Sequence, residues 1–367
     1  MRELPPVRTL VVKVGSSSLT TPRGRLSEAR LARVVGEVVR ARPGRHVVLV
    51  SSGAIASGWP ALGGRQRPKD MPGLQAAAAV GQGRLLAAYA RAFAAHRLAV
   101  GQVLLTQDDF LRRRHFVNAR NTIERLLRAG VVPVVNENDT VATEEIRFGD
   151  NDRLAALVAV MTGADLLVLL SDVGGIYTHD PRRGGARLLR RLDGSEAVSA
   201  TGPHRGQGGM ASKLEAARIA STAGVPVVVA GAAAPGVLER ILGGAEVGTY
   251  VAPRGRRVRG KKSWIGFALG AAGRVVVDAG AERALVQRGA SLLPGGVIGV
   301  EGSFGADDAV DVADRSGRAF ARGISAYSAE DLRTLVARKG APYDGASVSE
   351  RPVIHRDELV VMERWET

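Results

Sequence analysis

Several short apolar runs in roughly residues 9–250 are apolar on both faces, which most constrains how this chain can fold. A strand of that kind must be covered by helices on both sides, as in a parallel sheet. The runs read TLVVKVG, HVVLVSS, VGQVLL, VVPVVN, DLLVLLSD and VPVVVA. Stretches with helical character lie between them, at 26–40, 74–95, 117–129, 151–162 and 212–223. The pattern predicts an α/β fold of three layers, with a mainly parallel sheet between two layers of helices.

The chain of 367 residues is too long for one compact core, and its residue composition and pattern change near residue 253. The run PRGRRVRGKKS at 253–263 is charged and contains glycine, which is typical of an exposed joint. Short β-type runs with turns follow, and the alternation in VDVADRSGRAFARG predicts a hairpin with Asp314–Gly317 near its tip. We therefore expect a first domain at 1–252, a basic linker at 253–271 and a small β-rich domain at 272–367.

Composition excludes several kinds of protein. There are no cysteines, so disulfides, thiolate nucleophiles and cysteine-ligated zinc are excluded. No apolar run has the length of a membrane helix, and the first 15 residues lack a signal-peptide pattern, so we expect a cytoplasmic protein without membrane contact. Neither H-E-x-x-H nor G-x-S-x-G occurs.

The net charge of +15 comes almost entirely from arginine. Only six residues are lysine, at 13, 69, 213, 261, 262 and 339. Where arginine occupies the general surface, a remaining lysine is more often needed for its compact ammonium group.

Two of these lysines occupy unusual positions. Lys13 lies inside an apolar strand that ends at Gly15, and a buried ammonium group is costly unless it meets an anion. Lys213 follows the glycine-rich segment GQGGMAS, at the start of a predicted helix, where the helix dipole disfavours a cation. A bound phosphate would resolve both conflicts, because backbone N–H groups and ammonium groups would then act on the same anion. Two alternatives remain: Lys13 as a strand-end lysine whose ammonium group reaches water, and an ordinary flexible loop for the glycine segment.

A third feature is the stretch NENDTVATEEIRFGDND at 136–152, which holds six carboxylates in a basic chain. It directly follows the predicted strand VVPVV. In parallel α/β sheets, ligands bind beyond the carboxyl ends of strands. The segments KVGSSSL, SSGAIASG, NENDT and SDVGGIYTHDPR all begin at such ends. We expect Glu144 and Glu145 to be solvated loop residues.

Taken in order, these segments resemble the amino acid kinase family, and the last segment resembles a PUA domain, a small β-barrel-like module. Within the family, the chain is most similar to members that phosphorylate the side-chain carboxylate of L-glutamate, the first step of proline biosynthesis. The resemblance implies ATP and Mg²⁺ as cofactors, inhibition by proline and a homo-dimer or homo-tetramer. It does not identify a metal ligand.

The resemblance also implies roles for individual residues. Lys13 and Lys213 would be catalytic, with Asp152 holding their ammonium groups in place. The remaining assignments are substrate contacts at Ser52, Asn136, Asp139, Asp150 and Asn151, and nucleotide contacts at Lys13, Ser171, Asp172, Gln207, Gly208, Gly209, Met210, Ala211, Ser212 and Lys213.

The sequence departs from the family pattern at a few positions. Gln207 and Ser171 stand where threonine is usual, and GSSSL replaces the common GTSVL. These changes affect the expected nucleotide contacts and leave the lysines and glycines intact. Two alternatives stay open: a kinase for another amino acid or carboxylate, such as N-acetylglutamate or aspartate, and RNA binding through the PUA-like domain and the basic residues Arg254, Arg256, Arg257, Arg259, Lys261 and Lys262.

Overall fold

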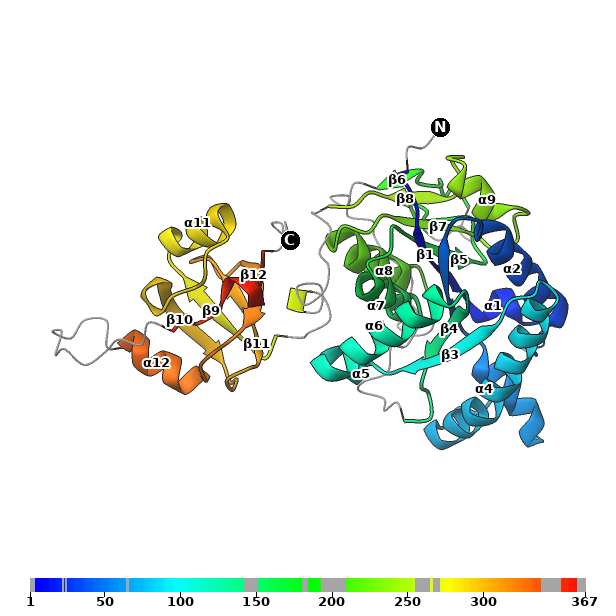
Figure 1. The fold of residues 1–367 in the computed structure, drawn as a ribbon, viewed down its shortest axis with the longest axis horizontal. Helices are drawn as coiled ribbons and strands as arrows, with labels where there is room; N and C mark the ends of the chain where they lie inside the picture. The colour runs from blue at the N-terminus through cyan, green and yellow to red at the C-terminus, as the bar shows by residue number, and fades with distance from the viewer. Residues whose placement is uncertain are drawn as a thin grey trace. The chain divides into compact units, whose positions relative to one another are not determined.

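The chain forms two compact units, Met1–Arg257 and Val258–Thr367 (Figure 1). The computed structural model describes residues 4–21, 23, 25–63, 66–141, 151–179, 184–192, 209–254, 265–266, 271–337 and 351–361. The predicted linker lies mostly outside these ranges. Of its residues, Pro253 and Arg254 are described in the first unit, and Ile265, Gly266 and Ala271 are described in the second.

An eight-stranded sheet forms the centre of the first unit, in the order β3-β4-β2-β1-β5-β7-β8-β6. Its strands are β1 (Thr9–Val14), β2 (His46–Ser51), β3 (Val100–Leu105), β4 (Val132–Glu137), β5 (Leu166–Ser171), β6 (Arg191–Leu192), β7 (Val227–Gly231) and β8 (Thr249–Val251). All neighbours pair in parallel except β7 and β8. The prediction of a mainly parallel sheet is confirmed. The six predicted strands are present, while β6 and β8 are too short to show a pattern in the sequence.

Helices connect these strands, as predicted. They are α1 (Ser16–Leu19), α2 (Glu28–Ala41), α3 (Ala54–Gly58), α4 (Met71–Ala94), α5 (Gln107–Leu111), α6 (Arg113–Arg128), α7 (Asn151–Thr162), α8 (Met210–Thr222) and α9 (Val237–Leu242). The predicted helix at 151–162 has the same bounds in the structure, and the other four differ by a few residues at their ends. The shortest helices have too few turns to show a helical period.

The alternation of side chains along β1 assigns the helices to two layers. Leu10, Val12 and Val14 face one side, where they share a hydrophobic core with apolar residues of α2, α4 and α9. Lys13 points to the opposite side, where α7 packs on β1 and α8 packs on α7 (Figure 1). The buried cation of β1 is therefore directed toward the α7–α8 layer.

Helices α3 and α4 cross at two glycines. A Cβ atom added to Gly58 would lie 1.8 Å from the carbonyl oxygen of Ala77, and one added to Gly81 would lie 1.8 Å from that of Ala54. Real Cβ atoms cannot approach an oxygen that closely, so both positions require glycine. This contact fixes α4 against the segment that follows β2.

The second unit contains a five-stranded sheet in the order β10-β9-β11-β12-β13. The elements are β9 (Gly273–Val277), α11 (Ala279–Arg288), β10 (Val297–Gly302), β11 (Ala309–Ala313), β12 (Ala319–Ile324), α12 (Ala329–Ala337) and β13 (Leu359–Val361). Its separate core includes Val275, Val312 and Phe320. The prediction of a small β-rich domain in this part of the chain is confirmed.

The predicted hairpin joins β11 and β12. Gly317 has a φ of 83°, a left-handed conformation that favours glycine. The carboxylate of Asp314 accepts hydrogen bonds from the backbone N–H groups of Ser316 and Arg318, at 2.9 and 3.1 Å. The side-chain hydrogen bond from Ser316 holds the pKa of Asp314 below its usual value.

In the residues that the structure describes, no helix is long and apolar enough to cross a membrane.

We predict that Gly81→Ala destabilises the first unit by at least about 2 kcal/mol, because the new methyl group overlaps the backbone of Ala54. Gly83→Ala is the matched control in the same helix, since a Cβ there meets nothing within 4 Å. The control should stabilise the protein by about 0.5–1 kcal/mol through helix propensity. Urea unfolding of both variants measures the difference, and equal stabilities would contradict the close crossing.

Candidate active site

The carboxyl ends of four adjacent strands, β4, β2, β1 and β5, meet at one edge of the large sheet. Small or polar residues stand at each of these ends: Asn136 on β4, Ser51 on β2, Gly15 after β1 and Ser171 on β5. The sequence predicted this meeting from the strand pattern, because the ends of parallel strands lie along the same edge.

A buried carboxylate lies between two buried lysines at this edge. Lys13 Nζ is 2.6 Å from Asp152 Oδ1, and Lys213 Nζ is 3.0 Å from Asp152 Oδ2. Asp152 is fully buried, and the two lysines are only 2% and 5% exposed. Charges at this depth are tolerated only where they are paired and hydrogen-bonded. The three residues predicted to be catalytic are thus brought together.

Local structure explains how each of these groups reaches the centre. Lys13 lies on the central strand β1, and Asp152 lies in the first turn of α7, where the helix dipole favours an anion. Lys213 lies in the first turn of α8, which begins after Gly209 without a side-chain cap. Ser212 Oγ donates to Asp152 Oδ2 at 3.3 Å. The unfavourable placement of Lys213 near a helix N-terminus is compensated by this carboxylate.

Next to the lysines, the side chain of Asn151 joins three strand-end residues. Its Nδ2 donates to the carbonyl oxygen of Ser51 at 2.6 Å, to Asn136 Oδ1 at 2.7 Å and to Ser52 Oγ at 3.2 Å. Three predicted substrate residues are therefore brought together, with Asn151 in contact with both Ser52 and Asn136. We call Ser52, Asn136 and Asn151 the amide cluster, and Lys13, Asp152 and Lys213 the lysine centre. Because Asn151 precedes Asp152 on α7, the amide cluster adjoins the lysine centre.

Of the other two predicted substrate residues, the structure describes only Asp139. Asp139 is half-buried, two residues beyond the end of β4. Asp150 lies outside the described residues, as do Glu144 and Glu145.

The predicted nucleotide residues come from β5 and from the start of α8. Ser171 is buried and its Oγ donates to Asp172 Oδ1 at 3.0 Å, while Asp172 is exposed. Gly209, Met210 and Ser212 are half-buried and Ala211 is exposed, whereas Gln207 and Gly208 lie outside the described residues. A Cβ at Gly15 would lie 3.8 Å from Lys13 Nζ, so the backbone after β1 passes beside the ammonium group.

Comparison with known proteins identifies the family of this chain. The family model described as "Amino acid kinase family" matches residues 8–231, and the PUA domain model matches residues 273–343. The chain belongs to the amino acid kinase family. The match covers every described element that contributes to the lysine centre and the amide cluster.

Relatives extend over almost the whole chain. A glutamate 5-kinase of Myxococcus xanthus is 49% identical over 97% of this chain and 96% of its own length. Glutamate 5-kinases of Streptomyces avermitilis and Frankia casuarinae are 48% and 49% identical, and each comparison covers 97% of both proteins. Among solved structures, an isopentenyl phosphate kinase is 20% identical, with a TM-score of 0.49, over 67% of this chain and all of the other. A likeness this weak carries nothing about activity.

Two residues of α4 that hydrogen-bond to the strand ends around the amide cluster were not predicted from the sequence. Asn136 Nδ2 donates to Gln82 Oε1 on α4 at 2.7 Å. Ser51 Oγ and the hydroxyl of Tyr89, also on α4, are 2.8 Å apart. Burial raises the pKa of Tyr89, so its hydroxyl stays protonated. Gln82 and Tyr89 stand within an alanine-rich helix, and nothing in that local pattern connects them to strand ends far away in the chain.

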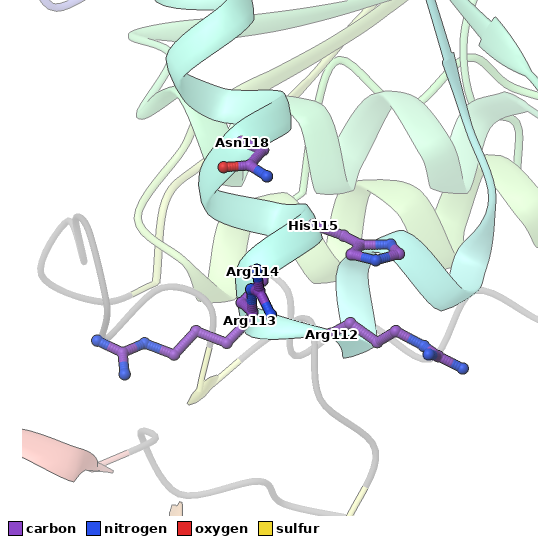
Figure 2. A pocket seen from close by; sticks show the side chains of 5 residues that line it. All are labelled: Arg112, Arg113, Arg114, His115 and Asn118. Carbon is purple, nitrogen blue, oxygen red and sulfur yellow. The ribbon is translucent and has the colours of Figure 1, made fainter.

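A separate basic cavity of about 540 Å³ lies at the start of α6. Figure 2 shows its lining: Arg112, Arg113, Arg114, His115 and Asn118. None of these is a predicted site residue. Arg112 pairs with Asp108 at 2.6 Å, and His115 Nδ1 lies 2.8 Å from Asp109 Oδ1.

The aspartate beside this cavity is held in its charged form. Burial by itself raises the pKa of Asp109, but hydrogen bonds from Thr106 and His115 outweigh burial and lower that pKa below its usual value. The same carboxylate accepts from the backbone N–H of Thr106 at 2.7 Å in the capping box of α5. These contacts stabilise the start of α5 and connect it to α6 through His115. Within the described ranges, no group of three or more His, Asp or Glu side chains is arranged to hold a metal ion.

We predict that Asp152→Asn costs about 3 kcal/mol or more in unfolding free energy, because two buried ammonium groups lose their shared counter-charge. Asp172→Asn is the matched control, since it removes an exposed carboxylate from the end of the adjacent strand and should change stability by less than about 0.5 kcal/mol. Urea unfolding at neutral pH compares them. Equal stability of the two variants would show that Asp152 does not hold the lysines.

Proposed function

We propose that this chain transfers the γ-phosphoryl group of ATP to the side-chain carboxylate of L-glutamate, giving γ-glutamyl phosphate for proline biosynthesis. The observation that carries the proposal is the contact of two buried lysines, Lys13 and Lys213, with Asp152 at the edge of the sheet where strands end. Relatives 48–49% identical over nearly the full length are glutamate 5-kinases, which supports the choice of substrate.

The two lysines would reduce the electrostatic repulsion between the two substrates of this reaction. A carboxylate and a triphosphate are both anions and repel each other, so catalysis depends on positioning and charge neutralisation. Ammonium groups act as point charges on the oxygens of the transferred group, and burial strengthens their effect. Asp152 holds both groups in fixed positions, which lowers the cost of reorganisation during transfer.

The proposed phosphoryl transfer does not require a proton transfer. An oxygen of the glutamate side-chain carboxylate forms a bond to the γ-phosphorus, and the bond from that phosphorus to the β,γ-bridging oxygen breaks, so that ADP leaves. A carboxylate is already ionised at neutral pH, so a general base is unnecessary. This agrees with a centre built from lysines and a fully buried aspartate.

The remaining residues would bind and orient the substrates. We assign Ser52, Asn136 and Asn151 to the amino acid, with the carboxylates of Asp139 and Asp150 directed to its ammonium group. Ser171, Asp172 and the segment Gln207–Lys213 would contact ATP. Mg²⁺ would reach the site with the nucleotide, held by phosphate oxygens and water, where it neutralises phosphate charge. We propose no protein ligand for it.

We also propose that the protein is cytoplasmic and acts as a homo-dimer or homo-tetramer. A kinase for N-acetylglutamate is less consistent with the site, because an acetylated amine has no charge for Asp139 and Asp150 to neutralise. Direct RNA binding is not favoured, since the relatives that match the whole chain are kinases.

We predict that Lys13→Met and Lys213→Met each lower the rate of γ-glutamyl hydroxamate formation by at least about 100-fold, because each removes one group that stabilises transition-state charge. Either variant leaves the other lysine paired with Asp152, so the fold should persist. Lys69→Met is the matched control, since Lys69 is exposed, and it should keep wild-type activity.

The same assay separates the possible substrates. ATP-dependent product formation with L-glutamate, and none with N-acetylglutamate, is expected for the wild type. Turnover of N-acetylglutamate alone would overturn the proposed function, and a Lys13 or Lys213 variant with full activity would overturn the assigned role of that lysine.

We predict that L-proline inhibits by competing with glutamate, because the two molecules share an α-carboxylate and an adjacent cationic nitrogen. Initial rates over a grid of both concentrations should show inhibition that saturating glutamate abolishes, with D-proline as the control compound. Inhibition that persists at saturating glutamate would place proline elsewhere.

A further inference from the structure

The side chain of Gln82 makes a polar contact with the amide cluster. It projects from α4, and its Oε1 accepts from Asn136 Nδ2 at 2.7 Å. Asn136 in turn contacts Asn151, which neighbours the catalytic Asp152. A series of three carboxamides therefore runs from α4 through β4 to α7.

Two backbone groups fix the orientation of every amide in this series. The carbonyl oxygen of Ser51 can only accept, so the atom of Asn151 that is 2.6 Å away must be its nitrogen. The backbone N–H of Glu137 can only donate, so the atom of Asn136 that is 2.9 Å away must be its oxygen.

The orientation of Gln82 follows from these two anchors. Asn136 Oδ1 accepts from both Glu137 N and Asn151 Nδ2, which leaves Asn136 Nδ2 as a donor. Its partner on Gln82 must then be the acceptor Oε1. The NH₂ group of Gln82 is consequently directed away from Asn136.

That NH₂ group is a donor buried inside the first unit. Gln82 Nε2 is buried and has no hydrogen-bond partner within the part of the chain that the structure describes. Leaving a buried donor unsatisfied costs about 1–3 kcal/mol, and such groups in native proteins call for an explanation. An acceptor on a bound ligand would supply the missing partner.

We propose that Gln82 Nε2 donates a hydrogen bond to the α-carboxylate of the bound amino acid and so contributes to substrate selection. The inference rests on the proposed function. An N–H donor suits a carboxylate and not an ammonium group. The side-chain carboxylate must meet the γ-phosphate beside Lys13 and Lys213, whereas Gln82 stands at the opposite end of the amide series. The α-carboxylate is the group of glutamate that would lie at that end.

Gln82→Glu is the decisive variant, because it keeps an oxygen for Asn136 and replaces only the donor, by an anion. We expect the KM for L-glutamate to rise about 10–100-fold, the loss expected for a hydrogen bond to a charged group, with little change in kcat or in the KM for ATP. Gln102→Glu, the same exchange at an exposed glutamine of β3, should leave all three values unchanged.

A second variant keeps the test valid if Gln82→Glu does not fold. Gln82→Met fills a similar volume and removes the buried donor. For the wild type, replacing glutamate by its α-amide should lower kcat/KM strongly, and in Gln82→Met this loss should be at least about 10-fold smaller. Thermal unfolding with and without glutamate checks that each variant is folded.

The outcomes separate the inference from the function. An unchanged KM for glutamate in Gln82→Glu, a fall in kcat at unchanged KM, or an equal α-amide penalty in wild type and Gln82→Met would each overturn the role of Gln82. Failure of the wild-type enzyme to phosphorylate glutamate would overturn the proposed function instead.

Discussion

The buried carboxylate of Asp152, in contact with two ammonium groups, is the interaction on which the rest of the first unit depends. Lys13 comes from the central strand, Asp152 from the start of α7 and Lys213 from the start of α8. Removing any one of these groups from water is costly, and only their mutual contact offsets that cost. The pairing therefore requires β1, α7 and α8 to meet at one point. That point lies at the edge of the sheet where parallel strands leave room for ligands.

The amide cluster extends the same centre toward α4. Its position depends on the crossing of α3 and α4, where Gly58 and Gly81 allow the two backbones to touch. Gln82 follows directly after one of these glycines, so the close crossing carries its carboxamide to Asn136. A packing requirement in the helical layer thus determines which side chains line the proposed amino-acid site, on the side away from the lysines.

The use of lysine in an arginine-rich chain now has a physical explanation. Of the six lysines, two are buried at one carboxylate, while Lys69 is exposed. A compact ammonium group can approach a single carboxylate oxygen from a strand or a helix start, whereas a planar guanidinium needs more room and prefers a two-pronged contact. Among the described residues, the rarity of lysine was a better guide to the centre than the net charge of +15.

The sequence by itself determined the layers of the first unit, the β-rich second unit and the strand ends that form the site, because apolar runs and glycine positions are local signals. It also singled out Lys13 and Lys213 as cations in costly places. That Asp152 holds both was implied by the family resemblance and by no local pattern, and the structure shows the contact. Only the tertiary structure decided that Asn151 joins Ser52 to Asn136 and that Gln82 of α4 contacts Asn136. These contacts join residues far apart in the chain, and their geometry depends on how helices pack on the sheet, which no local pattern records.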